Sequence, residues 1–150
     1  MARVTRTRTL EVPVGDVWKL VSDPYNLPRW WPRTSRVENV DRKDGGRRTQ
    51  WTKVLQTSEG RGVRADFRCV SSAERERYVW EQELAGTPFE RHLKSLRVEF
   101  GLRERDGGTE VSLTEEQTLK GMSKLGSPLM RRARGDILNE ALDGLERALT

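Results

Sequence analysis

The sequence is poor in metal-binding and nucleophilic side chains. It has one cysteine, Cys69, and one histidine, His92, in 150 residues. A single cysteine excludes an intrachain disulfide, and this pair cannot supply the usual ligand set of a zinc or transition-metal site. A histidine-based catalytic triad could use only His92, which lies among charges in FERHLK. A solvated or packed histidine is the simpler interpretation, and we expect no metal and no cofactor.

Long hydrophobic runs and phosphate-binding loops are also missing. No segment approaches the roughly 20 apolar residues of a membrane span. The basic N-terminus, MARVTRTRTLEV, lacks the apolar stretch of a secretory signal. No GxSxG or HExxH motif occurs, and the pairs Gly45-Gly46 and Gly107-Gly108 follow aspartates, as in hairpin turns. We expect a single cytoplasmic domain over residues 1–150.

Charge is plentiful and nearly balanced. The 28 basic and 23 acidic residues give a net charge of +5, and the pI is about 9.8. A net positive charge allows binding to RNA or to an anionic membrane. The charges are mostly interleaved, which favours a solvated surface, so nucleic acid is the weaker hypothesis. The densest basic clusters are Arg3, Arg6, Arg8 and Arg131, Arg132, Arg134.

Hydrophobic periodicity predicts the order of elements. Alternation with β-branched residues predicts a strand over residues 3–12. Helical spacing then predicts a short amphipathic helix over 14–22, which ends at Asp23-Pro24, and a second short helix or turn over 24–31. Alternating segments separated by turn signals predict six further strands, at residues 35–42, 47–57, 62–72, 75–84, 94–105 and 109–119.

The last third of the chain predicts one long helix. Ser127-Pro128 is a typical helix start, although a beginning near Met122 with a kink at Gly126 is also open. Gly135 and Gly144 lie inside the helix, which indicates either close approach of a neighbour or tolerance at the surface. The apolar stripe consists of Leu129, Ala133, Ile137, Ala141, Leu142, Leu145 and Leu149.

Together these elements predict an α+β fold. Antiparallel strands with one apolar face need a cover, and the C-terminal helix is the only element long enough to provide it. A bent sheet of about seven strands around one helix leaves space at the bend. That space is the candidate ligand pocket.

The segment DVWKLVSDPYNLPRWWPRTSRVENV, together with the element order and the amphipathic C-terminal helix, resembles the START/Bet v 1-like (SRPBCC) superfamily, in its bacterial polyketide cyclase/dehydrase and lipid-transport branch. The resemblance covers nearly the whole chain. It implies a helix-grip fold, with a curved antiparallel sheet wrapped around the long helix over an internal cavity. Members bind lipids, sterols, polyketides or hormones, a minority are aromatase/cyclases, and some associate with ribosomes or quinone-pathway components.

Five tryptophans stand out against two tyrosines and three phenylalanines. Trp30 and Trp31 lie between two prolines, and because adjacent residues diverge in direction, we expect one to plug the core and the other to meet the pocket rim. The predicted ligand-binding residues are Trp30, Trp31, Trp51, Phe67, Tyr78, Trp80, Gln82, Val98, Phe100, Leu129, Ala133 and Ile137, with Val63, Ala65 and Val111 as further lining. The alternative for each is ordinary core packing.

Acid–base catalysis by other groups stays open. Tyr78, Gln82 and Glu115 could face the concave side of the sheet and polarise a ketone. Alternatively, Tyr78 packs with its hydroxyl at an edge and Glu115 faces solvent. Glu115 and Glu116 are adjacent on a strand, so they point to opposite faces and cannot chelate together. No residue is assigned as catalytic.

Three functions compete. The first is binding of a hydrophobic small molecule, lipid or polyketide-like, in the internal cavity. The second is a polyketide aromatase/cyclase or dehydrase that acts on a substrate tethered to an acyl-carrier protein, whose acidic surface would suit the positive charge. The third is an interaction module that uses the basic surface to bind RNA, a ribosome or an anionic membrane.

Overall fold

The computed structural model describes residues 2–44, 48–56, 62–120 and 128–150, without the side chains of 128–130. The expected features at Gly45-Gly46, Met122, Gly126 and Ser127 lie outside these residues. The elements are β1 (Ala2–Leu10), α1 (Val14–Val21), η1 (Pro24–Asn26), α2 (Leu27–Trp30), β2 (Thr34–Asp41), β3 (Gln50–Gln56), β4 (Gly62–Ala73), β5 (Arg77–Glu83), η3 (Pro88–Arg91), β6 (Leu93–Arg105), β7 (Gly108–Leu119) and α3 (Pro128–Leu149).

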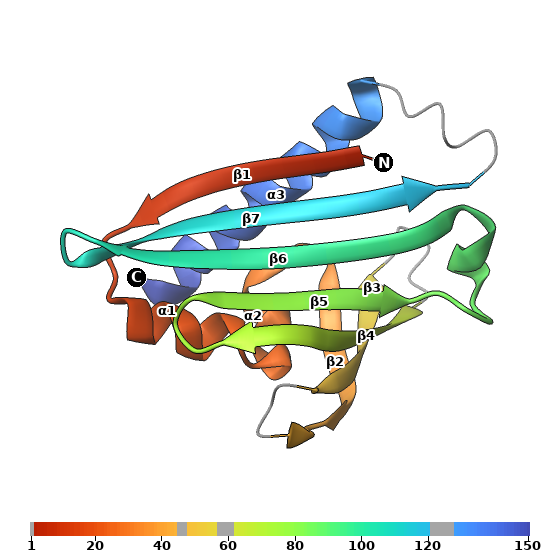
Figure 1. The fold of residues 1–150 in the computed structure, drawn as a ribbon, viewed down its shortest axis with the longest axis horizontal. Coiled ribbons are helices and arrows are strands. Elements are labelled where there is room, and N and C mark those ends of the chain that lie inside the picture. Colours follow the sequence, from red (N-terminus) through yellow and green to blue (C-terminus); the bar gives the residue numbers. More distant parts are fainter. Residues whose placement is uncertain (1, 45–47, 57–61, 121–127) are drawn as a thin grey trace.

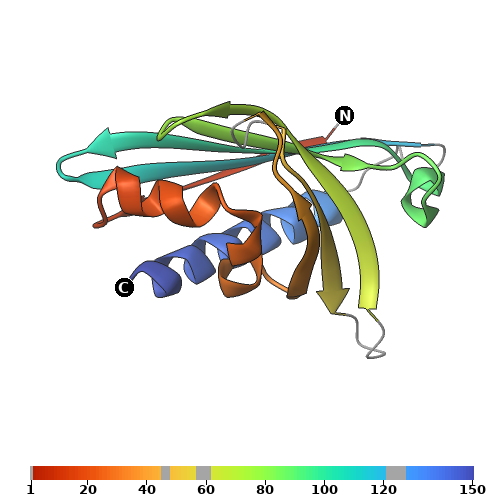
Figure 2. The same cartoon turned by 90° about the horizontal axis from the view of Figure 1, so that it is seen from below.

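The strands form one antiparallel sheet in the order β1-β7-β6-β5-β4-β3-β2 (Figure 1). Figure 2 shows that the sheet curves, so that β2, β3 and β4 descend beside the helices on its concave side. The short helices after β1 and the long α3 share that side. The predicted α+β helix-grip fold is therefore confirmed. No described helix is long and apolar enough to cross a membrane.

The hairpin between β6 and β7 shows how turn residues set the strand register. Arg105 pairs with Gly108, so the loop is Asp106-Gly107, and both residues have positive φ, 51° and 81°. This is the two-residue turn that the Asp-Gly-Gly sequence favours. A Cβ on Gly108 would lie 2.5 Å from the carbonyl oxygen of Leu10. Only glycine therefore allows β7 to begin this close to the end of β1.

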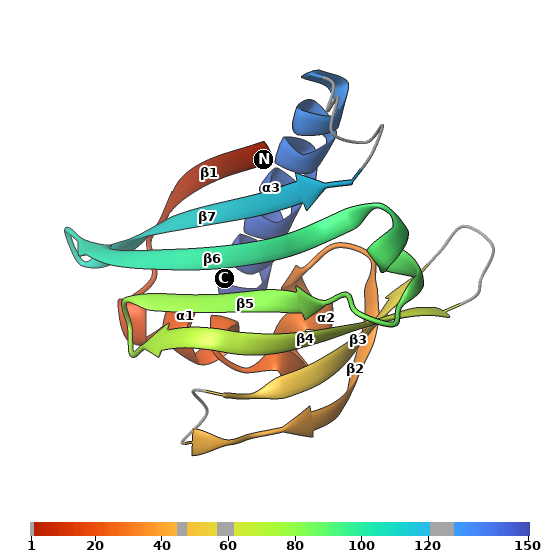
Figure 3. The ribbon, with the colours of Figure 1, turned by 45° about the vertical axis from the view of Figure 1, so that its right-hand side comes forward.

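Helix α3 buries Leu138, Ala141, Leu142 and Leu145 completely. The predicted stripe included Ala133, which is instead exposed. A spacing of four residues drifts around a helix of 3.6 residues per turn, so a stripe followed back from Ala141 leaves the buried face before it reaches Ala133. Figure 3 shows α3 running obliquely behind β1, β7 and β6.

The two helix glycines meet different neighbours. A Cβ on Gly144 would overlap the backbone carbonyl of Trp30, which cannot move away without shifting α2. A Cβ on Gly135 would meet only the guanidinium of Arg6, a flexible side chain. Close approach therefore explains Gly144, and it fixes α2 against the C-terminal half of α3.

Candidate functional site

A cavity of about 370 Å³ lies between the concave face of the sheet and α3. Its volume falls in the range of small-molecule sites. The apolar part of its wall comes from β3 to β6, η3, α3 and the segment after α2: Trp31, Pro32, Leu55, Val63, Ala65, Phe67, Trp80, Phe89, Leu93, Leu96, Val98 and Ile137. Val63 and the side chain of Arg33 are exposed, which places them at the rim.

Trp30 and Trp31 diverge as expected. Trp30 packs in the core with its ring centroid 5.1 Å from that of Phe100. Trp31 belongs to the cavity wall, and its ring lies 5.5 Å from Trp30 and 5.7 Å from Trp80, edge to face in both cases. Trp31 thus forms the boundary between the packed core and the cavity. Whether it contacts a ligand stays a prediction.

The other predicted binding residues divide between wall and core. Phe67, Trp80, Gln82, Val98 and Ile137 line the cavity, as do Val63 and Ala65. The remaining aromatic residues and Val111 do not line it; they pack in the core, Trp51 stacked on Phe67 with centroids 6.0 Å apart. The core residues are Trp30, Trp51, Tyr78, Phe100 and Val111. Exposed Ala133 is not in the wall, and the side chain of Leu129 lies outside the described residues.

Lys53 was not predicted, and it is the most unusual group in the wall. Its side chain comes from β3, is 7% exposed, and places Nζ 5.2 Å from the ring centroid of Trp31 and 4.9 Å from that of Phe67. These are cation–π distances. Burial lowers the pKa of Lys53 to about 8, against the opposing effect of the Glu115 charge, and Arg134 lowers it further. The ammonium is therefore poised to titrate just above neutrality.

Glu115 and Arg134 bridge the sheet and the helix across the cavity. The Arg134 Nε donates to Glu115 Oε2 at 2.6 Å, and Nη2 donates to Oε1, a bidentate pair. Glu115 is 3% exposed, so it does not face solvent as the alternative interpretation held. The neighbouring Glu116 points outward and pairs with Arg3, as strand alternation predicts.

Two amides complete the polar part of the wall. Gln117 follows Glu115 by two residues on β7 and is buried, and Gln82 comes from β5. The Nε2 of Gln82 is buried and has no hydrogen-bond partner in the part of the chain that the structure describes. A buried donor without a partner costs roughly 1–3 kcal/mol. A ligand acceptor within reach would recover that cost.

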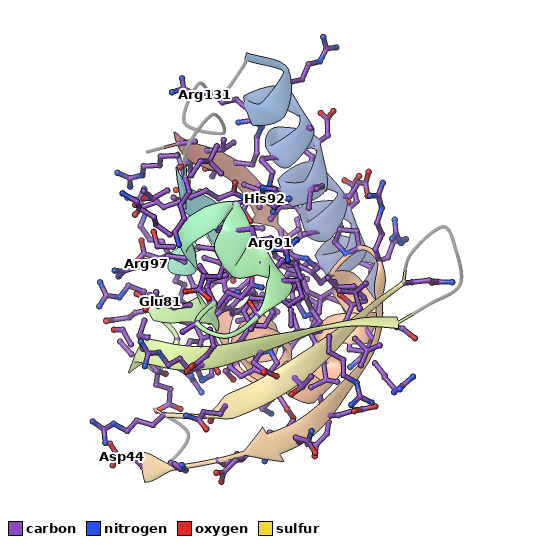
Figure 4. The ribbon with its side chains drawn as sticks, turned by 90° about the vertical axis from the view of Figure 1, so that its right-hand side faces the viewer. Asp44, Glu81, Arg91, His92, Arg97 and Arg131 are labelled. Atoms are coloured by element: carbon purple, nitrogen blue, oxygen red, sulfur yellow. The ribbon has the colours of Figure 1, made fainter. Side chains whose placement is uncertain are left out.

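Several other reactive groups lie outside the cavity wall. Tyr78 and Cys69 are buried together below the wall, and burial raises the pKa of both, so both are neutral near pH 7. His92 is exposed at the end of η3, beside Arg91, as Figure 4 shows. No cluster of three or more potential metal ligands occurs among the described residues.

The basic clusters are partly neutralised in the fold. Arg3 and Arg8 pair with Glu116 and Asp143, and Arg134 turns inward to Glu115. Arg131 is exposed near the start of α3 (Figure 4). This pairing reduces the free positive charge that β1 and α3 present. Binding of RNA, a ribosome or an anionic membrane stays a prediction.

The sequence held a signal for the missed residues. Lys53 lies between Trp51 and Leu55 at two-residue spacing, so it shares their inward face. Gln117 shares a face with Leu113 in the same way. Arg134 precedes the buried Leu138 by one helical turn. Strict alternation would have placed Lys53 and Gln117 inside, and helical spacing would have placed Arg134 near the buried face, although neither pattern would have shown that these residues meet.

The chain is matched over residues 1–150 by the family model described as polyketide cyclase / dehydrase and lipid transport. Among solved structures, a protein from Thermus thermophilus is similar at 19% identity with a TM-score of 0.77, covering 99% of this chain and 97% of that one. A START superfamily protein from Mycobacterium smegmatis is similar at 16% identity and TM-score 0.78, covering 98% and 96%.

A third similar structure is the di-domain ARO/CYC BexL from the BE-7585A biosynthetic pathway. It has 14% identity and a TM-score of 0.78, and the match covers 99% of this chain and 50% of that one. No curated protein matches the sequence. Identities this low establish a shared fold and do not transfer a ligand or a reaction.

Proposed function

Since the chain belongs to the polyketide cyclase / dehydrase and lipid transport family, we propose that it binds a hydrophobic small molecule, lipid or polyketide-like, in the cavity under α3. The observation that carries this proposal is the contrast within one concave face. Aromatic residues fill one part of it solidly, while a volume of about 370 Å³ lies open beside Trp31 and Trp80.

The driving force would be removal of apolar surface from water. Each Å² of apolar surface that binding removes from water, on the ligand or on the protein, contributes about 25 cal/mol. Phe67, Trp80 and Val98 offer apolar surface in the wall. Most of the wall belongs to strands that pair along their length, so the site is largely formed before a ligand arrives. Preorganisation lowers the entropic cost of binding.

The test fills the cavity and leaves the surface alone. Ala65 is buried in the wall, so Ala65→Trp would occupy the space that the ligand needs. Ala133→Trp adds the same side chain at an exposed position of α3. We expect the neutral fluorescent probe N-phenyl-1-naphthylamine to bind the wild type and the Ala133 variant, and to bind the Ala65 variant at least tenfold more weakly. Equal binding by all three would overturn the proposal.

A second function has one observation in its favour. The Lys53 amine, with a pKa of about 8, faces the cavity opposite the Glu115–Arg134 pair. Such an amine can accept a proton from a carbon between two ketones or, when protonated, polarise a ketone oxygen. Cyclisation of a poly-β-ketone uses these steps, so the chain is also a candidate polyketide cyclase. An acyl-carrier protein as the bearer of the substrate stays a prediction.

The two functions separate in one assay. A poly-β-ketone thioester is incubated with wild type, with Lys53→Met and with no protein, and the products are compared by mass spectrometry. Catalysis predicts a product pattern that changes with the wild type and reverts with the Lys53 variant. An unchanged pattern, with probe binding intact, would leave ligand binding as the function and exclude cyclisation of that substrate.

A further inference from the structure

The cavity wall carries unequal charge. Among the residues that the structure describes, it contains three cations, Arg33, Lys53 and Arg134, against the single carboxylate of Glu115. That carboxylate already accepts both hydrogen bonds of Arg134. Arg33 is exposed at the rim and can be hydrated. Of the described cations in the wall, the one that remains inside the cavity without a paired anion is therefore Lys53.

The Lys53 ammonium lies against aromatic rings and is not paired directly with a carboxylate. Among the described residues, its Nζ has no hydrogen bond and no carboxylate oxygen within 4.0 Å, and it lies over the ring faces of Trp31 and Phe67. An ammonium group offers three donors, and two ring faces do not replace the oxygen acceptors that water provided. Unpaired buried charges are rare in folded proteins because of this cost. The geometry calls for an acceptor that the protein does not supply.

We propose that the ligand carries a carboxylate on its hydrophobic body and that this carboxylate pairs with the Lys53 ammonium inside the cavity. The inference rests on the proposed function and specifies its ligand class. The apolar body would lie against Phe67, Trp80 and Val98, and the Nε2 of Gln82 offers a further donor for a ligand oxygen. Arg33 at the rim would attract an anion toward the entrance.

The charge state of the site agrees with this assignment. Burial lowers the pKa of Lys53 to about 8, so the group is still mostly protonated at pH 7. A bound carboxylate favours the protonated form and would raise this pKa. The other charged groups that face Lys53 are Glu115 from β7, which also favours protonation, and Arg134 from α3, which opposes it. Carboxylate affinity should therefore fall as the pH rises above about 8, by roughly tenfold per unit until the pH reaches the raised pKa of the complex.

The experiment uses matched probes on the intact protein. Dodecanoate, 1-dodecanol and methyl dodecanoate share a chain and differ at the head, and each is titrated below its micellar concentration by isothermal calorimetry at pH 7. We expect the wild type to bind dodecanoate at least tenfold more tightly than either neutral probe. In Lys53→Met, which keeps the length and apolar stem of the side chain, the three affinities should converge. Lys19→Met, at an exposed position on α1, is the matched control and should behave as wild type.

The outcomes distinguish the carboxylate assignment from the proposed binding of a hydrophobic ligand. Equal binding of the acid and the neutral probes by wild type would overturn the carboxylate assignment and leave hydrophobic binding standing. The assignment would also fail if Lys53→Met kept the preference for the acid. Failure of all three probes, together with failure of the naphthylamine probe, would reject the proposed function. Near-ultraviolet circular dichroism confirms that each variant is folded before titration.

Discussion

The concave face has a packed half and a hollow half, and the same strands build both. On β7 the inward residues run from Leu113 to Glu115 to Gln117, and on β5 from Tyr78 through Trp80 to Gln82. Leu113 and Tyr78 are core residues, whereas Glu115, Gln117 and Gln82 line the cavity. Along each of these strands, the inward face thus changes from apolar core residues to polar cavity-lining residues within two to four residues.

This change teaches how a small domain keeps a cavity. The packed half supplies cohesion through rings at 4.9 to 6.2 Å, including Trp30, Tyr78, Trp80 and Phe100. The hollow half contains groups that need partners other than hydrocarbon, so it does not collapse into a dry core. The Glu115–Arg134 pair spans the gap between β7 and α3. The packed half of the concave face therefore provides stability, and the hollow half provides the space for a ligand.

The largest effect should come from truncating the packed half. Trp30→Ala removes a buried ring between Phe100 and Trp31, and we expect it to lower the free energy of unfolding by about 3–5 kcal/mol. Trp31→Ala enlarges an existing cavity and should cost less, about 1–3 kcal/mol. Urea unfolding measures both. Equal losses for the two tryptophans would contradict the division into halves, as would a Trp31 variant that binds the naphthylamine probe with unchanged affinity.

Lys53 should make stability depend on pH. Its pKa is about 8 in the folded protein, against the ordinary lysine value of 10.5 that applies to the unfolded chain, so between these values the unfolded chain binds more protons. Stability should therefore rise with pH across this window, by about 3 kcal/mol in total at most, and this contribution is lost as the pH falls through 8. Lys53→Met should lack this rise. The measurement is urea unfolding of both proteins from pH 7 to 9.5, and parallel curves would refute the burial of a charged Lys53.

The two helix glycines test the close approach of α2 and α3. Gly144→Ala places a Cβ on the Trp30 carbonyl and should destabilise by about 2 kcal/mol, the cost of overpacking. Gly135→Ala meets only the movable Arg6 side chain, and alanine is the better helix former by about 1 kcal/mol. That variant should be neutral or more stable. Thermal unfolding compares the two, and a neutral Gly144 variant would mean that α2 moves freely.

The smallest effect concerns the charged bridge over the hollow half. Glu115→Gln leaves Arg134 without its carboxylate, but about 30% of the Arg134 side chain reaches solvent, so we expect a loss of only about 1–2 kcal/mol. The Glu115 charge also supports the protonated Lys53, so its removal should shift the pKa of Lys53 below about 8. Glu116→Gln, one residue along and at the surface, is the control and should cost under about 1 kcal/mol. Similar losses from both would contradict the buried bridge.

Most of the fold was accessible from sequence because each element carries a local signal. Alternation marked all seven strands to within three residues at their ends, and Asp23-Pro24 marked the end of the first helix. The Asp106-Gly107 turn set its hairpin because few residues accept positive φ. The covering helix followed from the need to bury one face. The pairing of β1 with β7 was not predicted, because no local signal joins strands at opposite ends of the chain.

The candidate site was less accessible because it depends on contacts between distant segments. Alternation could place Lys53 and Glu115 on inward faces, yet only the folded chain shows Arg134 reaching Glu115 from 19 residues away. Sequence reasoning also favoured aromatic residues as pocket lining, whereas Tyr78 and Phe100 fill the core. Residue type does not separate a ring that fills space from a ring that borders it. That distinction depends on the distance between α3 and the sheet at each position along the strands.

Four of the five tryptophans form a continuous series. Ring centroids lie 5.5 Å apart from Trp30 to Trp31, 5.7 Å from Trp31 to Trp80 and 5.8 Å from Trp80 to Trp51. The electronic transitions of indole rings at such separations couple, so the excitation energy is distributed over the four rings and does not stay on one. Two of the four, Trp31 and Trp80, border the cavity. A ligand in the cavity would therefore change the fluorescence spectrum of all four tryptophans. The intrinsic fluorescence of the protein would then report whether the cavity is occupied.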